Sequence, residues 1–270
     1  MSAVRQVSPP ILSRVDDAAI AILTLDCHPN RNALSEAMLA ALTAEFAAIT
    51  DDASVRAVVI AAKGPLFCPG HDLKEMTAHR SDADRGREYF EDIFGRCSAM
   101  MQMMARLPQP VIAAIEGIAT AAGCQLVATC DLAIAGSEAR FGASGVNYGL
   151  FCSTPMVALS RNIARKHSLE MLMTGELIDA TEAQRIGLVN RVAPAGKALD
   201  AALDLARVIA AKPPAAIKAG KQAFYQQIEM PLAEAYAHTS RVIVENMLAG
   251  EAEEGISAFI EKRAPRWPNE

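Results

Sequence analysis

The chain has 270 residues, of which 51% are hydrophobic and 21% charged, and its formal net charge at pH 7 is −5. This composition excludes disordered and fibrous proteins and is typical of a globular chain with a large core. The acidic balance gives no overall attraction to nucleic acid or to an anionic membrane, so we expect neither as a partner. Any polyanion would have to be held by local cations.

Strands and helices alternate in the predicted N-terminal part. Strands are predicted at 19–26, 55–62, 111–115 and 132–135, where apolar and β-branched residues are dense. The run VRAVVIAA is apolar without alternation, which is typical of a strand buried on both faces. Helices are predicted from the N-cap Ser35 to about Thr50, from a capping box at Asp72 and Glu75, over 85–107 and over 124–130.

After Ser153 the predicted elements are almost all helical. They cover 165–174, 181–186, 197–211, 215–229, 232–248 and 251–262, with one short run, LVNRV, between them. Repeated strand, turn and helix followed by helices predicts an α/β protein. We predict a core over residues 1–195 and a helical C-terminal region over residues 196–270.

The six cysteines and the N-terminus indicate where the protein resides. The cysteines lie in apolar stretches without the spacing of a zinc site, so we expect reduced, buried thiols and no metal; they are Cys27, Cys68, Cys97, Cys124, Cys130 and Cys152. The first residues lack a basic region followed by a long apolar run, so no secretory signal is expected. No uninterrupted apolar stretch reaches about 18 residues, so we expect no membrane span and a cytoplasmic location.

Two segments share one design: each follows a buried strand and leads into a helix. FCPGHDLKEM spans 67–76 and EGIATAAGCQ spans 116–125. N–H groups at a helix N-terminus lack partners within the helix and lie at the positive end of its dipole, and small residues there allow close approach of a ligand. Two such turns facing one another would offer two N–H donors to one oxygen that gains negative charge, an oxyanion hole.

The small residues of these turns also have a simpler explanation. Gly70, Ala121, Ala122 and Gly123 suit tight turns and close packing without any ligand. Composition alone favours this simpler interpretation.

Six sequence blocks carry a wider resemblance, which covers nearly the whole chain. They are LDCHPNRNAL (25–34), AVVIAAKGPLFCPGHDLKEM (57–76), PVIAAIEGIATAAGCQLVATCDLAIA (110–135), FGASGVNYGLFCSTP (141–155), MTGELIDATEAQRIGLVNRV (173–192) and GISAFIEKR (255–263). In order and spacing they resemble the enoyl-CoA hydratase/isomerase family, the crotonase superfamily. GHDLKE, TAAGCQL and GLFCSTP are most similar to one subgroup of that family. The resemblance implies a crotonase (ClpP/crotonase-like) spiral of ββα units with a C-terminal helical trimerisation region.

The resemblance also implies an acyl-CoA ligand, bound as substrate rather than as a separate cofactor, and a homotrimer or dimer of trimers. The backbone amides of His71 and Ala122 would hold the thioester carbonyl. The binding residues implied by the motifs are Arg31, Asn32, Ala33, Leu34, Gly70, Asp72, Leu73, Lys74, Gly123, Phe259 and Lys262. Phe259 and Lys262 would close over CoA from a neighbouring helix or subunit. Arg31, Lys74 and Lys262 suit a phosphate, although solvated surface cations would look the same.

Two positions depart from the family pattern. Hydratases of this family place one Glu in the helix after the second turn and another in the block that begins FG, where this chain has Gln125 and Gly145. The glutamine amide neither gains nor loses a proton near neutral pH, and glycine has no side chain. General acid–base catalysis contributes about 10²–10⁴-fold, so we expect ordinary hydration to be weak or absent. An isomerase that relies on the second Glu is disfavoured for the same reason.

Other side chains are candidates to replace the missing acids. They are His71, Glu116, Asn147, Tyr148 and Cys152. The simpler interpretations are a loop histidine that acts through its backbone, a solvated acid for Glu116, and an inert thiol for Cys152, which has no histidine nearby in the sequence. We expect Asp131 to anchor the start of a strand.

Two functional hypotheses follow. The first is an enzyme that stabilises the enolate of an acyl-CoA thioester with an unusual or impaired proton-transfer apparatus. The second is an acyl-CoA-binding or scaffolding protein that has lost the chemistry.

Overall fold

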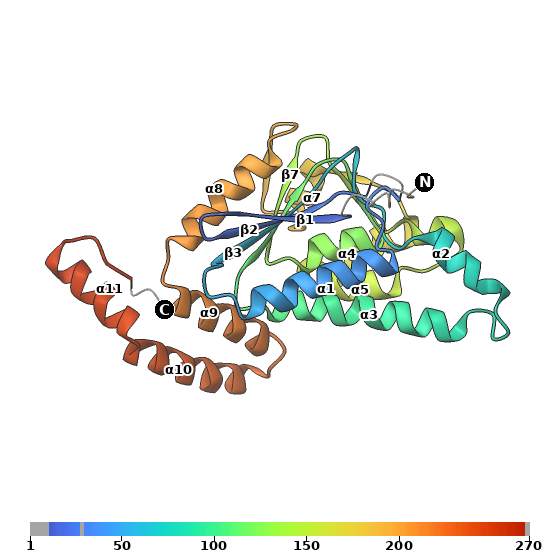
Figure 1. Cartoon of the computed structure of the whole chain (residues 1–270). Coiled ribbons are helices and arrows are strands. Elements are labelled where there is room, and N and C mark those ends of the chain that lie inside the picture. Colours follow the sequence, from blue (N-terminus) through green and yellow to red (C-terminus); the bar gives the residue numbers. More distant parts are fainter. Residues whose placement is uncertain (1–10, 28–29, 268–270) are drawn as a thin grey trace, which may run out of the picture.

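A six-stranded sheet forms the centre of the computed structural model, which describes residues 11–27 and 30–267 (Figure 1). Its strand order is β1-β2-β3-β5-β7-β10; β1 is antiparallel to β2, and the other neighbours are parallel. The strands are β1 (Leu12–Asp17), β2 (Ile20–Leu25), β3 (Ala57–Ala62), β5 (Val111–Ile115), β7 (Leu132–Gly136) and β10 (Arg191–Ala193).

The sheet is covered on both faces, as the unbroken apolar run at β3 predicts. Val58 and Ile60 pack in one cluster with residues of α1 (Glu36–Thr50), α3 (Arg87–Arg106) and α4 (Ala122–Thr129). Val59 packs on the opposite face against α8 (Ala198–Ala210). In Figure 1, α1, α3 and α4 lie on one side of the sheet and α8 lies on the other.

A second sheet consists of short strands in the order β4-β6-β8-β9. Its strands β4 and β6 lead into the two turns identified in the sequence. The strands are β4 (Leu66–Cys68), β6 (Ile118–Thr120), β8 (Arg140–Gly142) and β9 (Ile178–Asp179). Each of β4, β6 and β8 follows a strand of the main sheet and leads toward a helix, which produces the ββα repeat expected from the sequence. The segment 116–125, which the sequence analysis treats as a turn between a strand and a helix, also contains the short strand β6. Three-residue strands are too short to display a period of two.

The helix starts follow local chemistry. Ser35 caps α1, because its Oγ accepts a hydrogen bond from the Met38 N–H at 3.2 Å. Asp72 caps α2 (Leu73–Ala78) by accepting from the Lys74 and Glu75 N–H groups. The predicted capping box is formed only in this half, because the Glu75 carboxylate accepts from the Glu36 N–H at 3.1 Å instead. Several elements were not predicted: β1, α5 (Ser153–Asn162), the four short strands of the second sheet and two 3-10 turns. Between α2 and α8 the chain also forms 3-10 turns at His79–Ser81 and Ser144–Tyr148 (η2), and the helices α6 (Arg165–Thr174) and α7 (Ala180–Arg185).

The C-terminal helices leave the body of the molecule. After α8 come α9 (Pro214–Gln227), α10 (Leu232–Leu248) and α11 (Gly250–Glu261), and Figure 1 shows α10 and α11 extending away from the sheet. α8 begins just after the expected boundary at residue 195, yet it packs against the main sheet. None of the helices within 11–27 and 30–267 combines the length and apolarity needed to cross a membrane.

A buried charge cluster fixes α9 to the core. The Lys221 Nζ donates to Asp131 Oδ2 at 2.6 Å and to the Gln109 carbonyl at 3.0 Å. The Tyr225 hydroxyl donates to Asp131 Oδ1 at 2.9 Å, and the Val111 N–H donates to Asp131 Oδ2 at 2.7 Å. The prediction that Asp131 anchors a strand is therefore confirmed, since its carboxylate binds the first residue of β5. Burial lowers the pKa of Lys221, and the charge of Asp131 opposes that shift.

All six cysteines are buried and unpaired, which confirms the prediction of buried thiols. Burial raises the pKa of the Cys68 thiol to about 12, so this group stays protonated near neutral pH.

Candidate active site

A cavity of about 870 Å³ lies where loops leave the carboxyl ends of the strands. Its walls come from the loop after β2, the turn after β4, the turn after β6, and the segment from η2 to the start of α5. Ligands of α/β proteins bind outside the carboxyl ends of strands, because the loops there converge. Its location makes this cavity the candidate active site.

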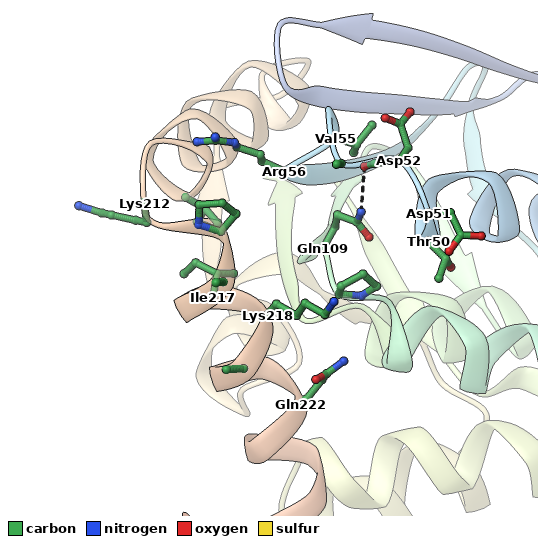
Figure 2. Close-up of a pocket in the computed structure, with 16 residues that line it drawn as sticks. Thr50, Asp51, Asp52, Val55, Arg56, Gln109, Lys212, Ile217, Lys218 and Gln222 are labelled. Atoms are coloured by element: carbon green, nitrogen blue, oxygen red, sulfur yellow. Dashed lines mark hydrogen bonds between the residues drawn. The ribbon is translucent and has the colours of Figure 1, made fainter. Parts of the chain in front are cut away.

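A second cavity of about 440 Å³ lies at the opposite ends of the strands (Figure 2). It is lined by residues that precede β3 and β5 and by the connection between α8 and α9. The Gln109 Nε2 donates to the Ile49 carbonyl at 2.8 Å, and the longer bond to the Asp52 carbonyl is dashed in Figure 2. Lys212 extends away from the other labelled side chains in that view. These polar groups do not converge on one point, so this cavity is not the candidate site.

The two turns identified in the sequence lie against each other at the wall of the candidate site. A Cβ built on Gly70 would be 3.1 Å from the Ala122 nitrogen and 3.1 Å from the Ala121 Cβ. Gly70 has φ +100°, which favours glycine, and Ala121 has φ 50° and ψ −123°, a conformation that residues with a side chain rarely adopt. Such backbone strain is concentrated at functional sites, because only a strong surrounding structure maintains it.

Two backbone amides of these turns are free to bind a ligand. Among the described residues, no carbonyl or side chain accepts a hydrogen bond from the N–H of His71 or of Ala122. Both residues line the cavity. The packing explanation and the ligand explanation of the small residues are therefore compatible. Gly70 and Gly123 allow close packing, and the His71 and Ala122 N–H groups beside them have no acceptor among the described residues.

The imidazole of His71 has a defined tautomer. Its Nδ1 is 3.2 Å from the Leu34 carbonyl oxygen, which only accepts, so Nδ1 carries the proton and Nε2 is an acceptor. Nε2 is buried and has no partner within the described part of the chain. Burial lowers the pKa of His71, so the ring is neutral at pH 7.

The residues expected to bind CoA fall into two groups. Arg31, Ala33, Asp72, Leu73 and Lys74 line the cavity, and Gly70 and Gly123 lie directly behind its wall. Phe259 and Lys262 do not line it; they lie at the end of α11, and Figure 1 shows α11 far from α2.

Asn32 and Leu34 stabilise the loop after β2 through internal hydrogen bonds. The Asn32 side chain is 2% exposed and is used internally: its Oδ1 accepts from the Cys27 N–H at 2.8 Å, and its Nδ2 donates to the Lys63 and Leu66 carbonyls at 2.9 Å. The Leu34 N–H donates to the Gly70 carbonyl at 2.8 Å. These bonds join the loop after β2 to the first turn, so any effect of Asn32 on a ligand is positional.

The two positions at which the resemblance implies acids, Gln125 and Gly145, are tightly packed. Gln125 is 5% exposed on α4, and its Oε1 has no partner among the described residues. Gly145 is buried in η2, where a Cβ would be 2.6 Å from the Leu150 carbonyl oxygen and 2.8 Å from the Cys152 sulfur. The space of a side chain at 145 is thus occupied by the segment around Cys152.

The candidate replacements for the acids are separated by the structure. Tyr148 and Cys152 line the cavity, whereas the Asn147 Nδ2 donates to the Gly175 carbonyl at 3.2 Å. Burial raises the pKa of Cys152, which disfavours a thiolate nucleophile. Glu116 lies outside the cavity lining and is not simply solvated: its Oε1 accepts from the Ala198 N–H at the start of α8 at 2.9 Å.

Two hydroxyl groups at the cavity wall were missed by the sequence interpretation. The Thr120 Oγ1 lies 2.8 Å from the Ser144 Oγ, and both residues line the cavity. Thr120 ends β6 and Ser144 begins η2, so only the pairing of β6 with β8 brings them together. The one sequence signal that could have pointed to this pair was Thr120, the threonine directly before Ala121 in the second turn.

A spiral of ββα units with a large cavity at the carboxyl ends of its strands is the architecture of a crotonase-type protein, and the sequence comparison agrees. The family description enoyl-CoA hydratase/isomerase matches residues 16–270, so the chain belongs to this family. The mitochondrial enoyl-CoA hydratase domain-containing protein 3 of Rattus norvegicus is 42% identical over 259 residues, which cover 96% of this chain and 85% of that protein. This is the subgroup indicated by the three short motifs.

Solved structures give the same result. The crystal structure of an enoyl-CoA hydratase from Mycobacterium smegmatis is 52% identical, with a TM-score of 0.91 and coverage of 96% of this chain and 99% of that one. The human enoyl-CoA hydratase domain-containing protein 3 is 42% identical, with a TM-score of 0.91 and coverage of 96% and 100%. The predicted crotonase fold and its C-terminal helices are confirmed.

Proposed function

We propose that this protein binds acyl-CoA thioesters in the 870 Å³ cavity and stabilises the thioester enolate with the His71 and Ala122 amides. The observation that carries the proposal is the pair of adjacent turns whose two N–H groups have no acceptor among the described residues. Donors aimed at a developing oxyanion contribute strongly to catalysis, since removal of one typically costs about 2.7–4 kcal/mol. Arg31 and Lys74 are exposed at the wall, without an ion-pair partner among residues 11–27 and 30–267, and suit the phosphates of CoA.

Standard hydration is weak or absent in this proposal. Asp72 is the one carboxylate lining the cavity within the described residues, and its oxygen caps α2. Gln125 and Gly145 stand at the positions of the usual acids. Proton transfer would therefore need another group, and Tyr148 and the neutral His71 imidazole are the candidates that line the cavity.

The same shortage of acids supports a second candidate, an acyl-CoA-binding or scaffolding protein without turnover. Calorimetry with CoA and acyl-CoA tests the binding that both candidates share. Incubation with unsaturated, malonyl-type and hydroxylated acyl-CoAs, followed by mass spectrometry of the products, separates them. Binding without turnover of any member supports the second candidate, and absence of binding contradicts both.

Replacement of Gln125 by Glu is expected to produce measurable hydration of a 2-enoyl-CoA. The change is nearly isosteric, and burial raises the pKa of a carboxyl group, so it would retain a proton to donate. We expect a rate increase of about tenfold or more over the unmodified protein, below the full effect of acid–base catalysis because position 145 still supplies no acid or base. Consumption of the 2-enoyl thioester measures it.

Gln222→Glu, on exposed α9, is the matched control and is expected to change nothing. Gly145→Glu is unsuitable as a partner change, because its Cβ would displace the Leu150 carbonyl and Cys152. An unchanged rate in correctly folded Gln125→Glu would contradict the assignment of this position to the reacting centre.

We propose that the protein assembles as a homotrimer or a dimer of trimers. Apolar side chains on α10 and α11 are largely exposed in the single chain, including Leu232, Leu248, Phe259 and Ile260 at 74%, 77%, 84% and 72%. An exposed apolar surface of this kind is typical of a subunit contact. A neighbouring copy would also allow Phe259 and Lys262 to reach a cavity other than that of their own chain.

Gel filtration is expected to give a trimer or larger species. The double change Leu248→Glu and Ile260→Glu should shift it toward monomer, because two charges would have to be buried. Val15→Glu, which adds one of these charges at an exposed residue of β1, should not shift it. A monomer formed by the unmodified protein contradicts the proposal.

A cytoplasmic location also stays a proposal. The rat relative carries the word mitochondrial in its name, so localisation of the tagged protein in cells is the relevant measurement.

A further inference from the structure

Glu251 is a buried carboxylate that caps a helix other than its own. It lies in the first turn of α11 and is 4% exposed. Its Oε1 accepts a hydrogen bond from the Ala215 N–H and its Oε2 accepts one from the Ala216 N–H, each at 3.2 Å. These N–H groups belong to the first turn of α9, where Pro213 provides no side-chain cap. The carboxylate of α11 therefore supplies the cap that α9 lacks.

Helix termini rather than a cation accommodate this buried carboxylate. Within the described part of the chain, the ion pairs of α11 join Arg263 to Glu254 and Glu261 and do not include Glu251. Glu251 is also the second residue of α11, whose own N-terminus has no side-chain cap. A negative charge is favoured at the positive end of a helix dipole, and N–H groups bond more strongly to a charged acceptor than to a neutral one. One carboxylate thus joins the N-termini of two helices.

Trp267 makes a second attachment at the same place. Its Nε1–H donates to the Ala211 carbonyl at 3.1 Å, and its ring lies against Gly255, where a Cβ would be 3.1 Å from the indole. In Figure 1 the chain after α11 returns toward α9. Among the described residues, the bonds of Glu251 and Trp267 are the hydrogen bonds that join residues 250–267 to residues before α10. All of them end at 211–216, the connection from α8 into α9.

These two attachments fix the direction of α11. Ala249 alone separates α10 from α11, and its φ of −74° and ψ of 143° are extended, so a rotation at this residue would move α11 as a unit. The helix that Glu251 caps is itself bound to the core through Lys221 and Asp131. The orientation of α11 relative to the core is therefore set through Glu251 and Trp267.

We infer that Glu251 is a positioning residue, which holds α11 in the direction from which Phe259 and Lys262 reach CoA bound to a neighbouring copy. The inference rests on the proposed acyl-CoA binding and assembly, and it names the residue that couples the two. The 12 residues of α11 span about 18 Å, so a pivot of roughly 10–20° at Ala249 would displace the far end by about 3–6 Å. Phe259 and Lys262 lie at that far end.

Calorimetry with butyryl-CoA and with S-butyrylpantetheine, which lacks the phosphates and adenosine of CoA, tests the inference. The unmodified protein should bind butyryl-CoA more tightly. Glu251→Gln keeps the shape but removes the charge and one of the two acceptors. It is expected to weaken butyryl-CoA binding roughly three- to tenfold, the equivalent of one net hydrogen bond, and to leave S-butyrylpantetheine binding unchanged. Trp267→Phe, which removes the second attachment, should give the same selective loss.

A combined variant shows whether Glu251 acts through the end of α11. In protein that already carries Phe259→Ala and Lys262→Ala, Glu251→Gln should cause no further loss, because the groups that it positions are gone. Glu253→Gln is the matched control, since it removes the same charge from an exposed residue in the first turn of α11. It should change neither affinity. Gel filtration and thermal unfolding establish that each variant is assembled and folded.

The outcomes separate this inference from the proposed function. An equal loss for both ligands, no loss in either Glu251→Gln or Trp267→Phe, or a loss that persists without Phe259 and Lys262 overturns the inference. Equal affinity of the unmodified protein for the two ligands also overturns it and leaves the proposed function standing. Failure of the unmodified protein to bind either ligand overturns the proposed function.

Discussion

Replacing Lys221 with methionine is expected to lower the free energy of unfolding by about 3 kcal/mol, at the low end of the cost of breaking a buried ion pair. The Lys221 side chain is 7% exposed and that of Asp131 14%, so the change leaves a carboxylate in a site that water hardly reaches. The remaining bonds from Val111 and Tyr225 to Asp131 moderate the loss. Because Lys221 also binds two carbonyls of the core, α9 should detach first.

Thermal or denaturant unfolding at one fixed protein concentration measures this effect, since association alters apparent stability. The melting temperature should fall by on the order of 6–12 °C. Lys218→Met, on the exposed side of the same helix, should stay within about 0.5 kcal/mol. The second change Asp131→Asn should recover part of the loss, because the unpaired charge is removed. A loss below about 1 kcal/mol would show that the pair contributes little to holding α9.

Gly123→Ala is expected to damage both stability and acyl-CoA binding. A Cβ at this position would overlap with the Cys68 carbonyl oxygen and lie 2.7 Å from its carbonyl carbon. Both atoms belong to the buried backbone at the end of β4, which cannot rotate away as a side chain can. The first turn, with Gly70 and His71, must then move away from Ala122. Overpacking of this kind costs about 1–3 kcal/mol.

Calorimetry and thermal unfolding measure the two effects. Because the two amides would no longer converge, we expect affinity for acyl-CoA to fall by about tenfold, the loss of roughly one hydrogen bond to a charged or polarised group. Gly95→Ala in α3 is the matched control: nothing lies within 4 Å of its Cβ, and alanine favours the helix by up to about 1 kcal/mol. Retained affinity in a folded Gly123→Ala protein would contradict the role of these turns in binding.

The sequence alone predicted the elements whose signals are local. β5, α6 and α10 occur with the predicted bounds, and Ser35 and Asp72 act as the predicted caps. Their periodicity and capping depend on neighbouring residues, which the sequence displays directly. The expectation that Gln125 and Gly145 occupy positions where hydratases carry acids likewise rests on residue identity and needs no coordinates.

Only the tertiary structure decided how distant segments meet. The second sheet was missed, because strands of two or three residues have no readable period and are stabilised by pairing with partners far along the chain. The same pairing brings Thr120 to Ser144, places Gly70 against Ala122, and directs Glu116 to the start of α8. The kinds of residue in the site were therefore determined by the sequence. Their convergence was decided by packing, since contact between residues tens of positions apart depends on the whole core that holds them.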